Sequence, residues 1–279
     1  MLNGFLVSAA RVAPIGGSHI LKFAARYNPA LQATPVRINN IPYEIFIDLR
    51  DQGFANFFLH GDGTGSQKLR SVLPQIVQPG DIFYDIGANI GLVSAVVHHA
   101  IGPSGTLIAF EPNPAVNRLY EMTFGGHQNV ILNKIALADQ TGEIRFYPAP
   151  ISGRSSLSPI EGVKPIFVSV RTLADMIAEF GLPDVLKVDV EGHEATVFSG
   201  AQGRFHGDSC PVIIFEALRV SELQETMTVI AGLHRGSGKF FNVCEDGKIA
   251  SVGQIKHSSD YIYVPKHKLD RVQGVIFDK

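Results

Sequence analysis

The feature that most constrains the fold of this chain is residues 81–101, where an apolar run passes through a glycine turn into a helical pattern. Residues 81–86 are apolar and aromatic apart from two acids, which is typical of a central parallel strand covered on both faces. Apolar residues then recur at steps of three and four up to Ile101, which predicts a helix that ends at Gly102-Pro103. Between strand and helix lies Gly87-Ala88-Asn89-Ile90-Gly91, where the missing glycine side chains let a ligand approach backbone N–H groups at a helix start.

An acid at the end of the next predicted strand helps to distinguish between two candidate cofactors. Residues 106–110 are hydrophobic and Glu111 follows them, about 20 residues beyond the loop, where an acid can accept hydrogen bonds from both ribose hydroxyls of an adenosine. A dinucleotide site prefers G-x-G-x-x-G, with glycines fitted to a pyrophosphate, whereas this loop reads G-x-N-x-G. S-adenosylmethionine (SAM) has no phosphate, so one glycine turn and one ribose acid suffice for it. The sequence therefore favours SAM over NAD, the alternative being a tight strand-to-helix turn without a ligand.

A second group of chemically active residues follows the predicted strand 184–190. In an open parallel sheet, ligands bind beyond the carboxyl ends of the strands at the switch in strand order, expected here between the first and fourth strands. Asp189 is thereby placed beside the cofactor, and Glu191 and His193 follow on the turn. We expect Asp189 to assist deprotonation of an acceptor, with Glu191 or His193 as substitutes. These acids can instead hold a divalent ion such as magnesium, although the sequence does not demand a metal.

Composition excludes several classes of protein. Hydrophobic residues make up 45% of the 279 residues and charged residues 18%, which excludes global disorder. The formal net charge of −2 gives no general attraction to nucleic acid. Cys210 and Cys244 each fall inside a predicted strand and show no metal-ligand spacing, so we expect two buried thiols in a reducing, cytoplasmic compartment.

The first 66 residues are expected to form an extension packed on a SAM-binding domain at 67–279. Residues 1–27 contain three basic residues and no acid, but they lack the span of about 20 apolar residues that a transmembrane segment needs. We therefore expect a peripheral helix that docks on the core or on a second subunit, giving a homo-oligomer. Residues 35–49 alternate between apolar and polar, which predicts a β-hairpin with a turn at 39–40. Residues 50–66 are predicted to be a loop.

The remaining elements are predicted from the same patterns. Residues 129–137 are expected to be the third parallel strand, with Ala136 and Leu137 beside the adenine ring. The other expected elements are an antiparallel pair at 142–147 and 166–170, a helix from the cap Thr172 to Phe180, a strand at 211–216 that ends on Glu216, a helix at 221–233, and strands at 240–244 and 261–264, the last reversed.

Four motifs in order make the chain resemble the FkbM family of SAM-dependent methyltransferases over roughly residues 79–217. They are Asp85-Ile-Gly-Ala-Asn-Ile-Gly, Phe110-Glu-Pro-Asn-Pro, Lys187-Val-Asp-Val-Glu-Gly-His-Glu and Phe215-Glu216. The resemblance implies an α/β fold of class I, a Rossmann-like, mostly parallel sheet of seven strands with helices on both faces. The cofactor-binding residues that it implies are Asp85, Gly87, Ala88, Asn89, Gly91, Glu111, Pro112, Ala136 and Leu137.

The resemblance also implies a reaction, namely methylation of a hydroxyl on a small molecule, a sugar or glycan, or a secondary metabolite. In-line transfer needs the acceptor oxygen held close to the methyl carbon, and much of the rate can come from that alignment. Two alternatives are a SAM-binding regulatory module without catalysis and, with less support, a nucleotide-dependent dehydrogenase. The acids at 189–194 favour an enzyme, and the missing pyrophosphate loop disfavours the dehydrogenase.

Overall fold

The structure is a computed structural model that describes residues 16–38, 41–61, 67–148, 155, 157–235, 237–244, 247–252 and 259–276. The predicted hairpin turn at 39–40 lies outside these residues, as do residues 1–15 and 62–66 of the expected extension.

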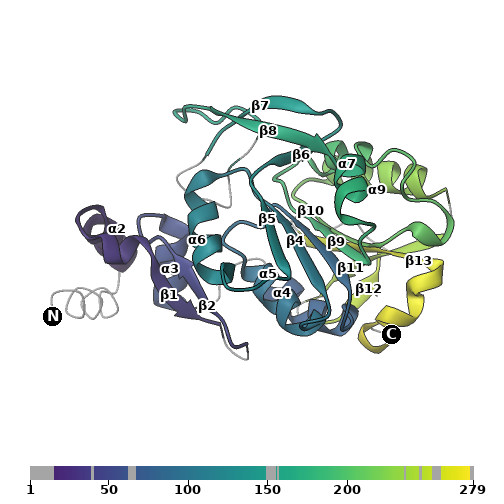
Figure 1. The fold of residues 1–279 in the computed structure, drawn as a ribbon, viewed down its shortest axis with the longest axis horizontal. Helices are drawn as coiled ribbons and strands as arrows, with labels where there is room; N and C mark the ends of the chain where they lie inside the picture. Colours follow the sequence, from purple (N-terminus) through teal and green to yellow (C-terminus); the bar gives the residue numbers. More distant parts are fainter. Residues whose placement is uncertain are drawn as a thin grey trace.

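A large sheet forms the centre of the molecule, with strands in the order β12-β11-β13-β10-β9-β3-β4-β5 (Figure 1). Its strands in chain order are β3 (Ile82–Ile86), β4 (Thr106–Phe110), β5 (Val130–Asn133), β9 (Val185–Val188), β10 (Val212–Ala217), β11 (Gly238–Val243), β12 (Ile249–Ser251) and β13 (Ser259–Pro265). Pairing is parallel from β5 through β10, and β13 runs antiparallel to its neighbours, as predicted. The expected count of seven strands is wrong by one, because β12 pairs with the edge strand β11 through only three residues, too few for a recognisable pattern.

The first and fourth strands of the parallel set lie side by side, as the sequence predicts. β3 pairs with β9 on one side and with β4 on the other, with Asp85 opposite Lys187. The carboxyl ends of three strands therefore meet where the chain order of the strands reverses. This is the edge at which parallel α/β sheets bind ligands.

The predicted third strand at 129–137 is wrong as a single element. β5 ends at Asn133, and β6 (Ala136–Ala138) joins a separate sheet of order β6-β8-β7, with β7 (Gly142–Phe146) and β8 (Ile166–Thr172). β7 and β8 are antiparallel, as expected. The apolar pattern continues across Lys134-Ile135, so periodicity alone does not show where the chain leaves the first sheet.

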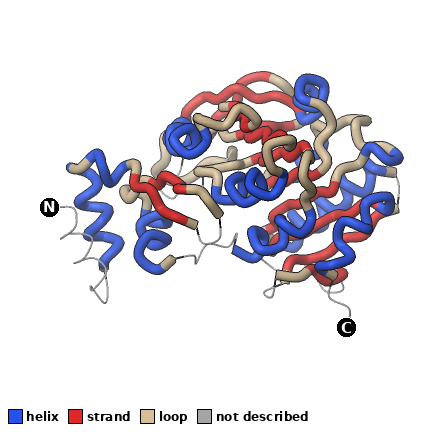
Figure 2. The backbone as a smooth tube through the Cα atoms, turned by 60° about the horizontal axis from the view of Figure 1, so that its bottom comes forward, coloured by secondary structure: helices blue, strands red, loops and turns tan. Residues whose placement is uncertain are grey.

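Helices cover both faces of the large sheet (Figure 2). They are α4 (Gln67–Ile76), α5 (Leu92–Ile101), α6 (Pro114–Phe124), α7 (Leu173–Phe180), α8 (Glu194–Ser199) and α9 (Val220–His234), with 3-10 segments η3 (Gly207–Ser209) and η4 (Lys266–Val275). Successive strand side chains point to opposite faces, so Phe83 packs in the cluster of α4 and α5, and Tyr84 packs in the cluster of α7, α8 and α9. The capping box predicted at Thr172 and Asp175 is present.

The N-terminal part contains the predicted hairpin and one helix that the sequence analysis missed. Its elements are α2 (Gly17–Tyr27), η1 (Pro29–Gln32), β1 (Thr34–Arg37), β2 (Glu44–Ile47) and α3 (Gln52–His60). The loop predicted at 50–66 is wrong, because Asp51 caps α3 by accepting hydrogen bonds from the backbone of Gly53 at 2.7 Å and of Phe54 at 3.2 Å. Ile45, Phe54 and Leu119 of α6 belong to one buried cluster, so this part shares a core with the sheet domain.

Two further expectations concern the membrane and the cysteines. No helix within the described ranges is long and apolar enough to cross a membrane. Cys210 and Cys244 are free thiols that lie just outside β10 and β11 rather than within them, and Cys244 is only partly buried. A homo-oligomer and the division at residue 66 stay predictions.

Candidate functional site

A pocket opens at the carboxyl ends of β3, β4 and β9, where the strand order reverses. The residues that line it come from both sheets and from the turns that follow their strands. They are Ile86, Gly87, Asn89, Phe110, Glu111, Pro112, Ile135, Ala136, Leu137, Phe146, Ser155, Leu157, Asp189, Val190 and Glu191. Eight of the twelve residues predicted for catalysis or cofactor binding are in this set, and Asp85, Ala88, Gly91 and His193 are not.

The glycine turn is shaped first by contacts within the protein. Gly87 has φ +77°, and a Cβ there would lie 1.9 Å from the backbone oxygen of Asp189, so the end of β9 itself demands a glycine. Gly91 has φ +89°, and a Cβ would lie 2.5 Å from the ring of Phe124. Ala88 is buried behind the turn. The two glycines therefore fix the path of the loop. Gly91 does so without lining the pocket.

Asn89 and Glu111 connect the turn to the end of β4. Asn89 adopts φ +52°, a left-handed conformation that asparagine tolerates better than most residues. Its backbone N–H donates to Glu111 Oε2 at 2.9 Å, and the backbone N–H of Asn113 donates to Glu111 Oε1 at 2.8 Å. Each carboxylate oxygen keeps accepting capacity for a further hydrogen bond, which suits the two hydroxyls of a ribose. Burial raises the pKa of Glu111 to about 7, and the two backbone hydrogen bonds act against that rise.

An apolar wall lies beside Glu111. Ala136 and Leu137 belong to it, as predicted for an adenine site, together with Pro112. Phe146 of β7 and Leu157 complete the wall, and sequence analysis did not identify either. Their contribution depends on how the small sheet folds over the large one, which no local pattern of residues encodes.

Lys187 links the two strands behind the pocket. Its Nζ lies 3.2 Å from Asp85 Oδ1, 3.3 Å from Asp189 Oδ2 and 3.4 Å from the carbonyl oxygen of Gly87. Burial acts to lower the pKa of Lys187, but the charges of Asp85 and Asp189 outweigh it and hold that pKa above its usual value. Asp85 also accepts a hydrogen bond from the hydroxyl of Ser94 at 2.6 Å. Lys187 was not among the predicted catalytic or cofactor-binding residues, although a lysine inside a buried strand needs such partners.

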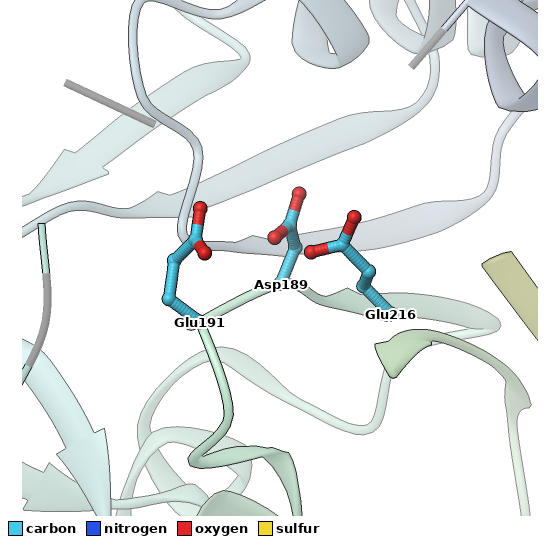
Figure 3. A group of neighbouring side chains, drawn as sticks. All are labelled: Asp189, Glu191 and Glu216. Carbon is cyan, nitrogen blue, oxygen red and sulfur yellow. The ribbon is translucent and has the colours of Figure 1, made fainter. Parts of the chain in front are cut away.

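Three carboxylates converge at the mouth of the pocket. Asp189, Glu191 and Glu216 offer oxygen atoms that lie within 4.8 Å of one another, and their side chains point to the same side of the sheet (Figure 3). Glu191 holds φ +55°, and strained backbone of this kind clusters at functional sites. Burial and then the charges of Asp189 and Asp260 raise the pKa of Glu216 to about 9. This rise favours the protonated form of Glu216, which would relieve the repulsion among the acids.

The turn after β9 is held by Glu194 rather than by His193. Glu194 is buried, and its Oε1 accepts hydrogen bonds from the backbone N–H of Val190 at 3.0 Å and of Gly192 at 3.3 Å. His193 lies outside the pocket lining, and its Nε2 is 3.1 Å from the hydroxyl of Ser158. Burial lowers the pKa of His193, which favours the neutral ring.

Comparisons with known proteins agree on one enzyme class. The profile described as "Methyltransferase FkbM domain" matches residues 85–235, more than half of the chain. Hexuronic acid methyltransferase AglP of Haloferax volcanii is 32% identical over 145 residues, which are 50% of this chain and 57% of that protein. 31-O-demethyl-FK506 methyltransferase FkbM of Streptomyces tacrolimicus is 26% identical over 196 residues, 58% of this chain and 74% of that protein.

Solved structures show a weaker likeness. The O-methyltransferase of Bacillus cereus, in complex with S-adenosylhomocysteine (SAH), is 12% identical with a TM-score of 0.43, over 74% of this chain and 83% of that chain. Likeness at this level carries no argument about chemistry. The family match covers the glycine turn, Glu111, residues 136–137 and the acids Asp189 and Glu191, which all contribute to the pocket lining, and it also covers Glu216 beside them.

Proposed function

This chain belongs to the FkbM methyltransferase family, and we propose that it transfers a methyl group from SAM to a hydroxyl group of a sugar, a glycan or a secondary metabolite. The observation that carries the proposal is the pocket at the strand ends. It is lined by a glycine turn, by an acid with free accepting capacity and by an apolar wall, which would suit the methionine end, the ribose and the adenine of SAM, and a group of acids stands beside it.

The acceptor is proposed from the relatives and from the chemistry of the acids. One relative is named for a hexuronic acid and the other for a demethylated FK506, and the hexuronic acid supports a sugar as acceptor here. Carboxylates are good hydrogen-bond partners for hydroxyl groups. Asp189 and Glu191 are accordingly the residues that orient an acceptor hydroxyl at the open side of the pocket.

Transfer itself requires the acceptor oxygen in line with the sulfur–methyl bond, and alignment supplies much of the rate. The oxygen forms a bond to the methyl carbon while the bond from that carbon to sulfur breaks, and SAH leaves. Asp189 is the group that takes the hydroxyl proton. Lys187 Nζ lies 3.3 Å from Asp189 Oδ2 and holds that carboxylate in position.

Either a proton or a divalent cation can neutralise the three acids at the mouth. The oxygen atoms of Asp189, Glu191 and Glu216 fit a hard ion such as magnesium, which prefers carboxylates and water. Addition of EDTA to the active enzyme distinguishes the two. Activity that is lost and then restored by magnesium would assign these acids as metal ligands, whereas unchanged activity would leave Asp189 as the base.

Glu111→Ala is expected to weaken SAM binding by about 1–3 kcal/mol, the cost of losing charge-assisted hydrogen bonds at a buried site. Isothermal calorimetry with SAM, SAH and NAD measures the affinities. A wild-type protein that binds NAD but neither SAM nor SAH would contradict the proposed function. Glu225→Ala is the matched control, because Glu225 lies exposed on α9. Equal SAM affinity of a folded Glu111→Ala variant and the control would refute the ribose assignment.

SAM affinity is also expected to depend on pH through Glu111. The ionised carboxylate accepts hydrogen bonds at both oxygens, whereas protonation turns one oxygen into a donor. Because the pKa of Glu111 is raised to about 7, the ionised form and the SAM affinity should be lost as the pH falls through that value. Calorimetry should therefore show tighter binding at about pH 8 than at about pH 6, one unit on either side of that pKa. Glu111→Gln should remove this difference.

A further inference from the structure

Helix α2 has one face packed on the protein and one face that the described structure leaves open. Ser18, Leu21 and Ala25 are buried, and Gln52 Nε2 of α3 donates to the hydroxyl of Ser18 at 2.5 Å. Gln32 Nε2 donates to the carbonyl of Ala25 at 2.8 Å. The helix is therefore fixed in place before it meets any partner. Figure 1 shows it at the outer end of the N-terminal part.

The outer face of α2 carries an apolar stripe. Ile20, Phe23 and Tyr27 follow at steps of three and four, so their side chains lie in one row. They are 38%, 62% and 77% exposed, and the two aromatic rings contact each other edge to face at 5.4 Å. Single exposed apolar residues are ordinary on protein surfaces, whereas a row that contains two aromatic rings marks an interaction surface.

Two basic residues lie along one side of this stripe. Lys22 and Arg26 lie one helical turn apart, and within the described ranges no acid forms an ion pair with either. The first 43 residues contain four Lys and Arg residues and no Asp or Glu, but Arg37 pairs with Glu44 and Arg11 lies outside the described residues, so Lys22 and Arg26 carry the positive charge of this surface. The surface around the stripe therefore favours a negatively charged partner.

We propose that the outer face of α2 docks the protein on the surface of an anionic lipid bilayer. Aromatic residues prefer the headgroup level of a bilayer, and each Lys or Arg near an anionic surface adds to the attraction. Helices that bind membranes in this way have an apolar row beside a basic face. Since α2 is already folded on α3, binding requires no ordering of the helix.

A second copy of the chain suits this face less well. A two-fold pairing of α2 with itself would bring Lys22 and Arg26 of both copies to one interface, and neither helix has an acid to pair with them. Anionic lipid supplies the missing negative charge. The requirement for negative charge therefore distinguishes a lipid surface from a second copy of the chain by experiment.

The chain contains no tryptophan, so Phe23→Trp introduces a single fluorescent reporter on the stripe. The full-length variant is mixed with vesicles of phosphatidylcholine, alone or equimolar with phosphatidylglycerol. We expect a blue shift of the emission with the anionic vesicles only, and its loss at high salt. Phe167→Trp is the matched control, because Phe167 of β8 is 67% exposed on another part of the surface and should show no shift.

Vesicle sedimentation of variants without a tryptophan tests the apolar stripe and the basic residues separately. Phe23→Ser with Tyr27→Ser should lower binding to anionic vesicles at least about tenfold, as expected for withdrawing two aromatic rings from an apolar environment. Lys22→Gln with Arg26→Gln should lower it roughly thirtyfold, at about 1 kcal/mol for each charge. Circular dichroism and SAM affinity should be unchanged in both pairs.

Three outcomes would overturn the proposal. Wild-type protein that stays in solution with anionic vesicles is one, and serine variants that bind as the wild type does are another. The third is a Phe23→Trp variant whose emission is already blue-shifted in buffer without vesicles. If that shift disappears on dilution, a second copy covers the face, and if it does not, the chain itself covers it.

Discussion

Asp189→Asn is expected to lower methyl transfer by roughly 10²–10⁴-fold while SAM affinity changes little. Asparagine keeps the shape of the side chain and its hydrogen-bonding capacity but removes the negative charge and the basicity. Asp189 lies at the mouth of the pocket with about a third of its side chain exposed, so the substitution should also leave the fold intact. The variant thus separates the transfer step from capture of the cofactor.

The measurement is formation of SAH over a panel of sugar and glycan acceptors that the wild type methylates. Asp208→Asn is the matched control, because that side chain is 94% exposed in η3 and outside the pocket. Near-normal turnover of Asp189→Asn would show that positioning alone accounts for the rate. Glu191→Gln then identifies whether the neighbouring acid takes the proton instead.

The parts of the site that local sequence encodes could be predicted. The strand 82–86, the glycine turn and Glu111 follow one another along the chain, and the parallel pairing of β3 with β9 places Asp189 against Gly87. Hydrophobic periodicity and turn chemistry carry that information, and each element is short enough to be recognised without tertiary contacts.

The parts that depend on distant contacts could not be predicted. Phe146 and Leu157 enter the pocket only because β7 and β8 form a sheet with β6, after the chain has left β5. Glu216 was expected on the ligand side of the sheet, but the pairing of β9 with β10 is what brings its oxygen atoms within 4.8 Å of those of Asp189 and Glu191. Gly91 stays a predicted cofactor-binding residue, but it does not line the pocket, and a Cβ there would lie 2.5 Å from the ring of Phe124.

Lys187 shows how burial changes the meaning of a residue. In the sequence it is a charge inside an apolar strand, with Asp189 two residues further along the chain. In the structure its side chain is 4% exposed and it joins Asp85, Asp189 and the carbonyl of Gly87. It fixes the glycine turn and the end of β9 in one arrangement, so a change at this position should affect the whole pocket.

Lys187→Met is accordingly expected to lower the free energy of unfolding by about 3–5 kcal/mol, because it leaves Asp85 as an uncompensated charge in the core. Asp85 is fully buried, and among the described residues the hydroxyl of Ser94 is the side-chain donor that remains to it. Urea denaturation measures the loss. Lys134→Met is the matched control, since Lys134 forms a surface ion pair with Glu121 at 2.6 Å with both side chains about half exposed. Such a pair should contribute less than about 1 kcal/mol.

The double variant Asp85→Asn with Lys187→Met tests the physical cause of that loss. If the loss comes from an unpaired charge, removal of the charge at residue 85 should return much of the stability, so the double variant should be more stable than Lys187→Met alone. If the loss comes from packing around the lysine stem, the second substitution should add to the first. A Lys187→Met protein as stable as the Lys134→Met control would show that Asp85 finds its compensation elsewhere, and the link between β3 and β9 would then rest on backbone pairing alone.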